Sequence, residues 1–280
     1  MDELPDYELD KTTDESTPAT PSQTRPVGLW AVVAVLMAAA AVAAYIAFAW
    51  RPRPPAASAQ LSAPARATPR SLGGTPEPIT IPPLDASDPV VRTLVRALSE
   101  SPAVTAWLAT NGLIRNFTVA VTNIADGATP AKHLNVLRPP SPFRIVERAG
   151  NSYVDPRAYD RYTWIADAIA SVDPAAAARL YATLKPRIEE AHRELGSPDQ
   201  FDRTLERAIV AILDTPVVDG PVRLKQKGIG YAYADERLES LTAAQKQLLR
   251  MGPRNVGIIK ARLREIALAL GIPGTQLPAP

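Results

Sequence analysis

The sequence predicts a mainly helical α+β protein, in which one membrane-spanning helix precedes a proline-rich linker and one globular domain with a small sheet. Three observations support this prediction. Residues 27–50 contain no charged, amide, Ser or Thr side chain. Residues 51–84 contain nine prolines. Beyond them, apolar residues recur mostly at helical spacing, with a few short alternations that are typical of strands.

Residues 1–26 predict a disordered acidic tail. They contain seven acidic and two basic residues, together with many Thr, Ser and Pro residues. Such a segment has too few apolar side chains to offset the entropy lost on folding.

Residues 27–50 predict a transmembrane helix that anchors the chain in a lipid bilayer. A helix of 24 residues is about 36 Å long, which is enough to cross a hydrocarbon core of about 30 Å. Trp30 lies near one end, and Tyr45 and Trp50 lie near the other, as in the aromatic belts of membrane proteins.

Two other interpretations of residues 27–50 are a buried helix of a soluble protein and a cleaved signal peptide. Soluble helices rarely lack polar residues over such a length. A cleavage motif exists at Ala57-Ser58-Ala59, but the apolar run is longer than the usual signal-peptide core and prolines separate the two. Residues 51–84 then predict a semi-rigid spacer, because proline favours extended backbone.

Residues 85–275 are the expected globular domain, followed by a short tail at 276–280. Helix starts are predicted where Ser or Asp precedes Pro, because the side chain caps the helix and Pro suits its first position. These capping residues are Asp88, Ser101, Asp155, Asp173 and Ser197. Helical stripes cover residues 91–98, 104–108, 159–172, 180–195, 201–212, 241–252 and 253–270.

Three segments predict strands. Residues 117–121 alternate apolar and polar side chains before a turn at Asp126-Gly127. Residues 143–153 predict a hairpin. At 222–233 the alternation changes face near Lys227-Gly228, which fits a tight hairpin or one strand with a glycine bulge; we favour the bulge.

Composition argues against several chemistries. The chain has no Cys and only two His residues, and no motif for a dinucleotide, phosphate-loop, zinc-protease or serine-hydrolase site occurs. We therefore expect no catalytic residue, no metal site and no cofactor. A net charge of +2 does not suggest a nucleic-acid partner. Glu189 and His192 share a helix face, and we expect them to form a surface pair.

Two clusters are candidate binding residues. Arg161 lies one helical turn before Trp164, and both residue types are common in protein interfaces. Lys246 and Arg250 share a helix face ahead of a helix start at Gly252-Pro253, and Arg254 and Asn255 follow it. A helix N-terminus flanked by basic residues is suited to an anion. Both clusters are also compatible with ordinary packing.

The domain resembles a bacterial family called DUF3014, a domain of unknown function. The resemblance runs from Asp88 to Gly271, and its most specific stretch is QKQLLRMGPRN. In the family pattern an aromatic residue often stands where His192 and Ser197 stand here. The resemblance implies an N-terminal membrane span followed by this domain, and it implies no catalytic residue. The other matching stretches are SDPVVRTLV, LIRNFTVAVTNIADG, DPRAYDRY, RELGSPDQFDRTLERAI and YAYADERLESL.

We therefore expect a single-pass protein of the bacterial inner membrane whose domain binds a protein, a second copy of itself or an envelope component. More basic residues follow the span than precede it, which favours a cytoplasmic domain. A long proline-rich tether suits a periplasmic domain, and long domains cross membranes regardless of charge, so we favour the periplasm. The alternatives are a cytoplasm-facing adaptor and a tethered enzyme that acts on an anionic envelope substrate.

Overall fold

A computed structural model describes residues 71–139 and 141–279, which belong to one compact unit, Ala67–Pro280. The acidic tail, the predicted span at 27–50 and most of the proline-rich linker lie outside the described residues. Within the described part of the chain, no helix combines the length and the hydropathy that a membrane crossing requires.

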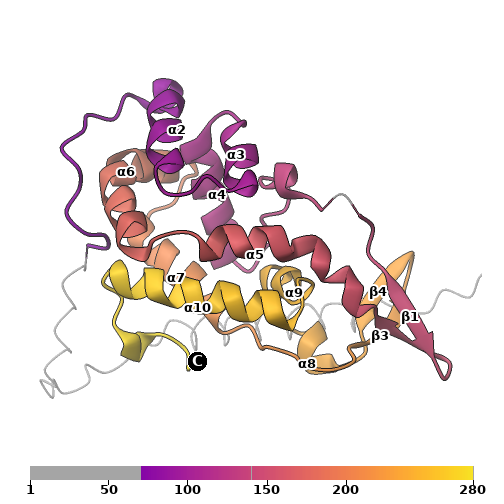
Figure 1. The fold of residues 1–280 in the computed structure, drawn as a ribbon. Coiled ribbons are helices and arrows are strands. Elements are labelled where there is room, and N and C mark those ends of the chain that lie inside the picture. Colours follow the sequence, from indigo (N-terminus) through magenta and orange to yellow (C-terminus); the bar gives the residue numbers. More distant parts are fainter. Residues whose placement is uncertain (1–70, 140, 280) are drawn as a thin grey trace, which may run out of the picture. The chain divides into compact units, whose positions relative to one another are not determined.

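The unit is mostly helical and has one small sheet (Figure 1). Its α-helices are α2 (Asp88–Arg96), α3 (Pro102–Leu108), α4 (Leu113–Ala125), α5 (Thr163–Ala170), α6 (Pro174–Glu194), α7 (Phe201–Leu213), α8 (Glu236–Glu239), α9 (Ala243–Leu249) and α10 (Pro253–Ala269). Its strands are β1 (Ile145–Arg148), β2 (Asn151–Val154), β3 (Arg223–Lys227) and β4 (Gly230–Tyr233). Short 3-10 turns lie at Leu84–Ala86, Asn135–Leu137, Pro156–Ala158, Asp160–Tyr162 and Gly274–Gln276.

Three of the five predicted Ser/Asp-Pro caps behave as expected, and two do not. Ser101 and Asp173 accept backbone N–H bonds at the starts of α3 and α6. Asp155 accepts the N–H of Arg157 at the start of the 3-10 turn Pro156–Ala158. Asp88 is instead the first residue of α2, and its carboxylate accepts the N–H groups of Gly112 and Leu113. Helix α7 does not start at Ser197. It begins at Phe201, whose N–H donates to Glu189 Oε1 at 3.0 Å, so a carboxylate from α6 replaces the expected local cap.

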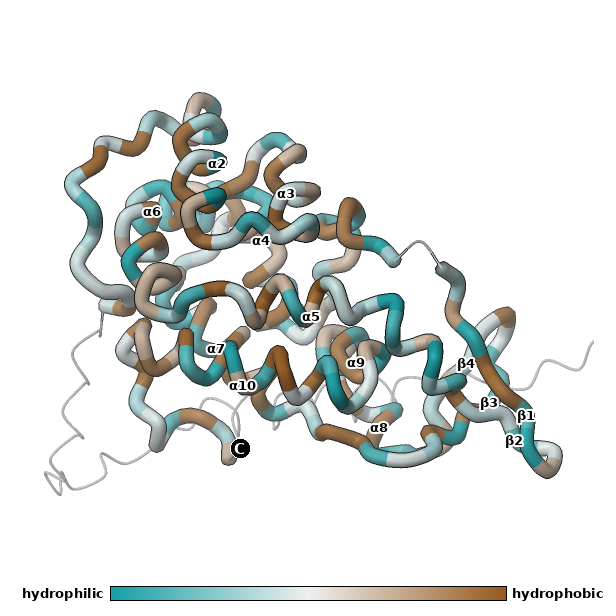
Figure 2. Tube along the Cα trace, in the orientation of Figure 1, coloured by the Kyte–Doolittle hydropathy of each residue, from teal (hydrophilic) through white to brown (hydrophobic). Residues whose placement is uncertain are grey.

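The main core lies between α2, α4, α6, α7 and α10. The hydropathy colouring shows apolar residues recurring along these helices (Figure 2). Leu72 and Ile81 are buried in this core, and the N–H of Gly73 donates to Leu270 O. Leu277 is buried there as well. The packed chain therefore begins before residue 85 and extends past residue 275, the boundaries expected from the sequence.

Helix α4 corrects the strand that was predicted at residues 117–121. Ile114, Thr118 and Val121 are buried on one face of this helix at spacings of four and three residues. Thr118 is β-branched, which in the sequence favours a strand. In the structure its hydroxyl donates to the carbonyl of Ile114 at 2.8 Å. This internal bond lets a polar side chain face the core of a helix.

The sheet is antiparallel with strand order β1-β2-β3-β4. The predicted hairpin at residues 143–153 is confirmed as β1 and β2. The predicted bulge at 222–233 is wrong, because Leu224 pairs with Tyr233 and Lys227 with Gly230 in a regular hairpin. Gly228 supplies the positive φ of 58° that its two-residue turn needs. β3 also pairs with β2, so this hairpin is not an isolated pair of short strands.

Helix α10 connects the main core to the sheet end of the unit. Figure 1 shows α5 and α10 side by side, and the start of α10 lies nearer the sheet than its end does. A small second core lies under the sheet, where Val154, Leu224, Tyr233 and Leu249 are buried together. The start of α10, the end of α9 and the strands β3 and β4 therefore meet at this end.

Candidate functional site

A cleft of about 650 Å³ lies between the sheet, the end of α9 and the start of α10. We call it the basic cleft. Strands β3 and β4, helix α8 and the segments around residues 143 and 159 complete its walls. Its lining combines charged, aromatic and aliphatic side chains, which is typical of ligand and peptide sites. Its lining includes Phe143, Tyr159, Arg161, Lys227, Ile229, Tyr231, Tyr233, Glu239, Lys246, Arg250 and Gly252.

The cleft carries an excess of positive charge. Arg161, Lys227, Lys246 and Arg250 line it, and Glu239 is the acidic residue among its lining residues, which gives a formal net charge of +3. Several like charges in one concave surface raise the local concentration of anions and the rate at which anionic partners associate. Lys246 of α9 and Arg250, which follows α9 directly, are four residues apart and therefore on the same side, and both line the cleft.

Glu239 organises one side of the cleft. Its carboxylate accepts the N–H of Tyr233 at 3.1 Å and lies 3.4 Å from Lys227 Nζ and 3.5 Å from Lys246 Nζ. The N–H of Tyr233, followed by the lysine charges, lowers the pKa of Glu239 below its usual range. Lys246 also donates to the Glu239 carbonyl at 2.9 Å. Lys246 therefore fixes α8 against α9 as well as contributing charge.

Arg250 and Arg161 differ in how firmly they are held. Arg250 is exposed, and within the described part of the chain it makes no ion pair; it donates to Gln247 Oε1 at 3.3 Å. Arg161 lies over the ring of Tyr162 at 4.8 Å and donates to the carbonyl of Ser141 at 3.0 Å. Its Nε is buried and has no hydrogen-bond partner among the described residues. Arg250 is thus the charge that is most available to a partner.

Exposed apolar side chains surround the basic residues. Phe143 and Tyr231 are 38% and 42% exposed, and Ile229, at the tip of the β3–β4 turn, is fully exposed. All three also line the cleft. Aromatic and aliphatic side chains that stay exposed beside charges are typical of interaction surfaces.

The floor of the cleft depends on Gly252. Its φ is +83°, and a Cβ at this position would lie 2.3 Å from Cγ of Tyr159. Burial raises the pKa of Tyr159, and burial also raises the pKa of Tyr233 to about 12. Both phenols are therefore neutral near pH 7, and they contribute packing rather than charge.

The structure brings together three of the six candidate residues. Arg161, Lys246 and Arg250 line the basic cleft. Arg254 is exposed and its Nη1 lies 3.4 Å from Asn255 Oδ1, but neither residue lines the cleft. Asn255 is 2% exposed, and its amide donates to the carbonyls of Tyr159 and Met251, which joins α10 to the segment before α5.

Trp164, the remaining candidate, is half-buried. Its indole N–H donates to the carbonyl of Arg161 at 2.9 Å, and it does not line the cleft. The sequence reasoning missed Lys227, Glu239, Phe143 and Tyr231. Lys227 follows the alternation of β3 and precedes a glycine turn, but its place in the cleft depends on pairing β3 with β4, which the predicted bulge obscured.

The expected surface pair of Glu189 and His192 is wrong. His192 is 1% exposed and packs its ring edge against Phe201 at 5.2 Å, because α7 covers this face of α6. Its Nε2 lies 3.4 Å from Thr204 Oγ1, and its Nδ1 has no partner among the described residues. Within residues 71–139 and 141–279, no three His, Asp or Glu side chains are grouped closely enough to hold a metal ion.

The family comparison covers both the helical core and the cleft. The family described as "Protein of unknown function (DUF3014)" matches residues 113–267, which is more than half of the chain, so the chain belongs to this family. Neither a curated protein nor a solved structure matches it.

Proposed function

We propose that this DUF3014 protein is a membrane-tethered binding protein whose basic cleft captures an acidic, partly apolar segment of a protein partner. In this proposal residues 27–50 cross the inner membrane, residues 51–70 belong to the tether, and the domain lies in the periplasm. The apolar length of residues 27–50 and the proline content of the following segment support the tether.

The observation that carries this proposal is the combination of basic and apolar groups in one cleft. Arg250 is exposed and unpaired within the described part of the chain, and Phe143 and Tyr231 remain exposed beside it. A small inorganic anion would use the charges alone. A peptide segment with acidic and apolar residues would use both, and aromatic residues and Arg are enriched among the few residues that dominate the affinity of such interfaces.

The arrangement gives less support to an enzyme that acts on an anionic substrate. Glu239 is held between two lysines and its pKa is lowered, so it is a poor proton donor near pH 7. Asp160, the carboxylate next to Arg161 in the sequence, is exposed and does not line the cleft. The raised pKa values of Tyr159 and Tyr233 keep both phenols protonated.

Peptide display on the immobilised full-length protein tests this proposal. We expect the selected peptides to be enriched in Asp and Glu together with apolar residues. Arg250→Glu should lower the affinity of a selected peptide about tenfold, because the attraction between an exposed arginine and the acidic residues of the peptide becomes a repulsion. Arg254→Glu is the matched control, since Arg254 is exposed but lies outside the cleft, and it should change affinity less than twofold. Peptides without acidic enrichment, or equal losses in both variants, would contradict the proposal.

A reporter fused after Pro280 tests the proposed compartment. An alkaline phosphatase fusion is active only in the periplasm, whereas a green fluorescent protein fusion exported in the unfolded state is dark. We expect phosphatase activity in the membrane fraction. Fluorescence without phosphatase activity would support the cytoplasm-facing adaptor instead, and recovery of the intact chain in the soluble fraction would contradict the tether.

A further inference from the structure

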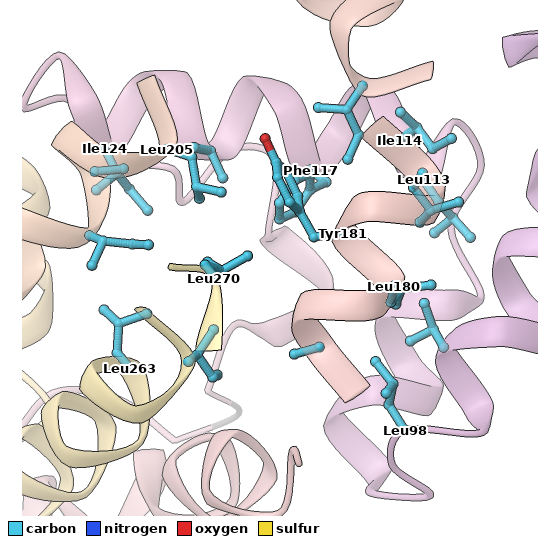
Figure 3. Close-up of a pocket in the computed structure, with 18 of the residues that line it drawn as sticks. Leu98, Leu113, Ile114, Phe117, Ile124, Leu180, Tyr181, Leu205, Leu263 and Leu270 are labelled. Atoms are coloured by element: carbon cyan, nitrogen blue, oxygen red, sulfur yellow. The ribbon is translucent and has the colours of Figure 1, made fainter. Parts of the chain in front are cut away.

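A second hollow lies inside the helical part of the unit, away from the basic cleft. It has a volume of about 390 Å³ and is lined by side chains from α2, α3, α4, α6, α7 and α10. We call it the apolar cavity. Figure 3 labels ten of the lining residues, most of them on α4, α6, α7 and α10. Helix α10 contributes to both hollows: Pro253 and Val256 line the cleft, and Leu263 and Ile266 line the apolar cavity.

The lining of the apolar cavity is hydrocarbon almost throughout. Its members are Ala, Val, Leu and Ile with Phe117, Trp107 and Tyr181. The hydroxyl of Tyr181 already donates to Asp202 Oδ1 at 2.5 Å, so it is not free to bind a ligand. A water molecule needs two to four polar partners, and this lining does not provide them. The chemistry therefore selects a ligand, or part of a ligand, without polar groups.

The apolar cavity is large and reachable for such a ligand. Phe117, Leu180 and Leu263 line it and are only half-buried, although each packs against the main core. A cavity of about 150 Å³ accommodates benzene, so 390 Å³ has room for about 16 carbon atoms. This matches one long hydrocarbon chain and is too small for both chains of a diacyl lipid of that length.

We infer that the apolar cavity binds the hydrocarbon chain of one free, unbranched fatty acid of about 16 carbons. The inference is independent of the basic cleft, since it depends on a different set of side chains. The carboxylate of the fatty acid stays at the mouth in water, because the Tyr181 hydroxyl already donates to Asp202 and the rest of the lining, apart from the Trp107 indole, is hydrocarbon. The hydrocarbon chain of the fatty acid packs between α4, α6, α7 and α10 and contacts the side chains that line the apolar cavity.

Photocrosslinking of the full-length protein in lipid nanodiscs tests this inference. The probe is a 16-carbon fatty acid with a diazirine near the middle of its chain, and mass spectrometry locates the adducts. We expect adducts on the lining residues of α4, α6 and α7. Adducts confined to residues 27–50 would overturn the inference. Equal labelling of the lining residues by a diacyl phospholipid that carries the diazirine would also overturn the inference, because the cavity would then hold an acyl chain of a bilayer lipid and not a free fatty acid.

Chain length provides a second, independent readout. Both the bilayer and the apolar cavity remove methylene groups from water, so unlabelled fatty acids of 12 to 16 carbons should compete with the probe about equally at equal membrane concentration. Each methylene that extends beyond a full cavity stays in water and should weaken competition about fourfold. A 20-carbon acid should therefore compete on the order of 100 times less well. Competition that does not depend on chain length would overturn the inference.

Two alanines of α6 provide matched variants. Ala177 lines the apolar cavity, whereas Ala175 is exposed and does not. Ala177→Phe places a ring in the cavity and should reduce cavity adducts at least tenfold, while Ala175→Phe should leave them unchanged. If circular dichroism shows that Ala177→Phe is not folded, Leu180→Trp fills the cavity from a half-buried position. Undiminished cavity adducts in a folded filling variant would overturn the inference.

Discussion

Gly252→Ala tests the packing that forms the floor of the basic cleft. Gly252 precedes α10, and its φ of +83° with a ψ of 162° is a backbone conformation that almost only glycine adopts. A Cβ would approach Cγ of Tyr159 to 2.3 Å and Cδ2 to 2.6 Å. The tyrosine cannot simply move away, because Asn255 donates to its carbonyl at 3.1 Å and its ring packs under the sheet.

The expected loss of stability has two parts. The backbone conformation costs a residue with a Cβ about 1–3 kcal/mol. Overpacking against the Tyr159 ring adds about 1–3 kcal/mol. We therefore expect Gly252→Ala to lower the free energy of unfolding by about 4 kcal/mol, a large part of the stability of a typical domain. The full-length protein in urea, followed by circular dichroism, measures this change.

Gly257→Ala is the matched control in the same helix. No atom lies within 4 Å of a Cβ at Gly257, so alanine there should raise the free energy of unfolding by about 0.5–1 kcal/mol through helix propensity. In a Tyr159→Ala background, Gly252→Ala should cost less stability than in the wild type, because the overpacking part of the loss is gone and only the backbone part remains. A Gly252→Ala protein within about 0.5 kcal/mol of wild type would refute the proposed packing.

Two further substitutions test the helical core. Asp202→Ala removes a buried carboxylate that lies 2.5 Å from Lys185 Nζ and accepts a hydrogen bond from the Tyr181 hydroxyl. Urea denaturation should therefore show that the free energy of unfolding falls by about 3–5 kcal/mol. A decrease below about 1 kcal/mol would contradict a buried ion pair. Burial lowers the pKa of His192 in the folded protein. Below pH 6.5, about the pKa of histidine in the unfolded chain, the unfolded chain therefore takes up a proton more readily than the folded one, and the wild type should lose stability as the pH falls. His192→Phe should lack this dependence between pH 7.5 and 5.5, and an unchanged slope in the variant would show that other groups cause it.

Most helices could be predicted from the sequence because their capping residues and apolar stripes are local signals. α6 begins after Asp173 as predicted, and α10 begins at Pro253 as predicted. α4 could not be recognised because Thr118 and Val121 favour strands by themselves, and only the fold shows that the Thr118 hydroxyl bonds within the helix. His192 was placed on the surface because helix periodicity does not show that α7 covers that side of α6.

The candidate site could be predicted only in part. Lys246 and Arg250 were found together because their spacing on one helix is a local property. Lys227 and Glu239 meet them through the pairing of β3 with β4 and through α8, which are contacts between separate segments. Asn255 directly follows Arg254 in the sequence, yet Arg254 is exposed and Asn255 is buried, where its amide donates to the carbonyl of Tyr159. The apolar cavity has no local signal, since its lining is spread over six helices.

Site-specific photocrosslinking in cells tests the central claim, capture at the basic cleft, most directly. A benzophenone amino acid at Tyr231 lies on the rim of the cleft, and one at Leu268 is a control that is similarly exposed on α10 but outside the cleft. We expect a discrete adduct at Tyr231, joined to an acidic segment of another protein, that Arg250→Glu abolishes and Arg254→Glu does not. The same adducts at both positions, or a Tyr231 adduct unaffected by Arg250→Glu, would contradict the account.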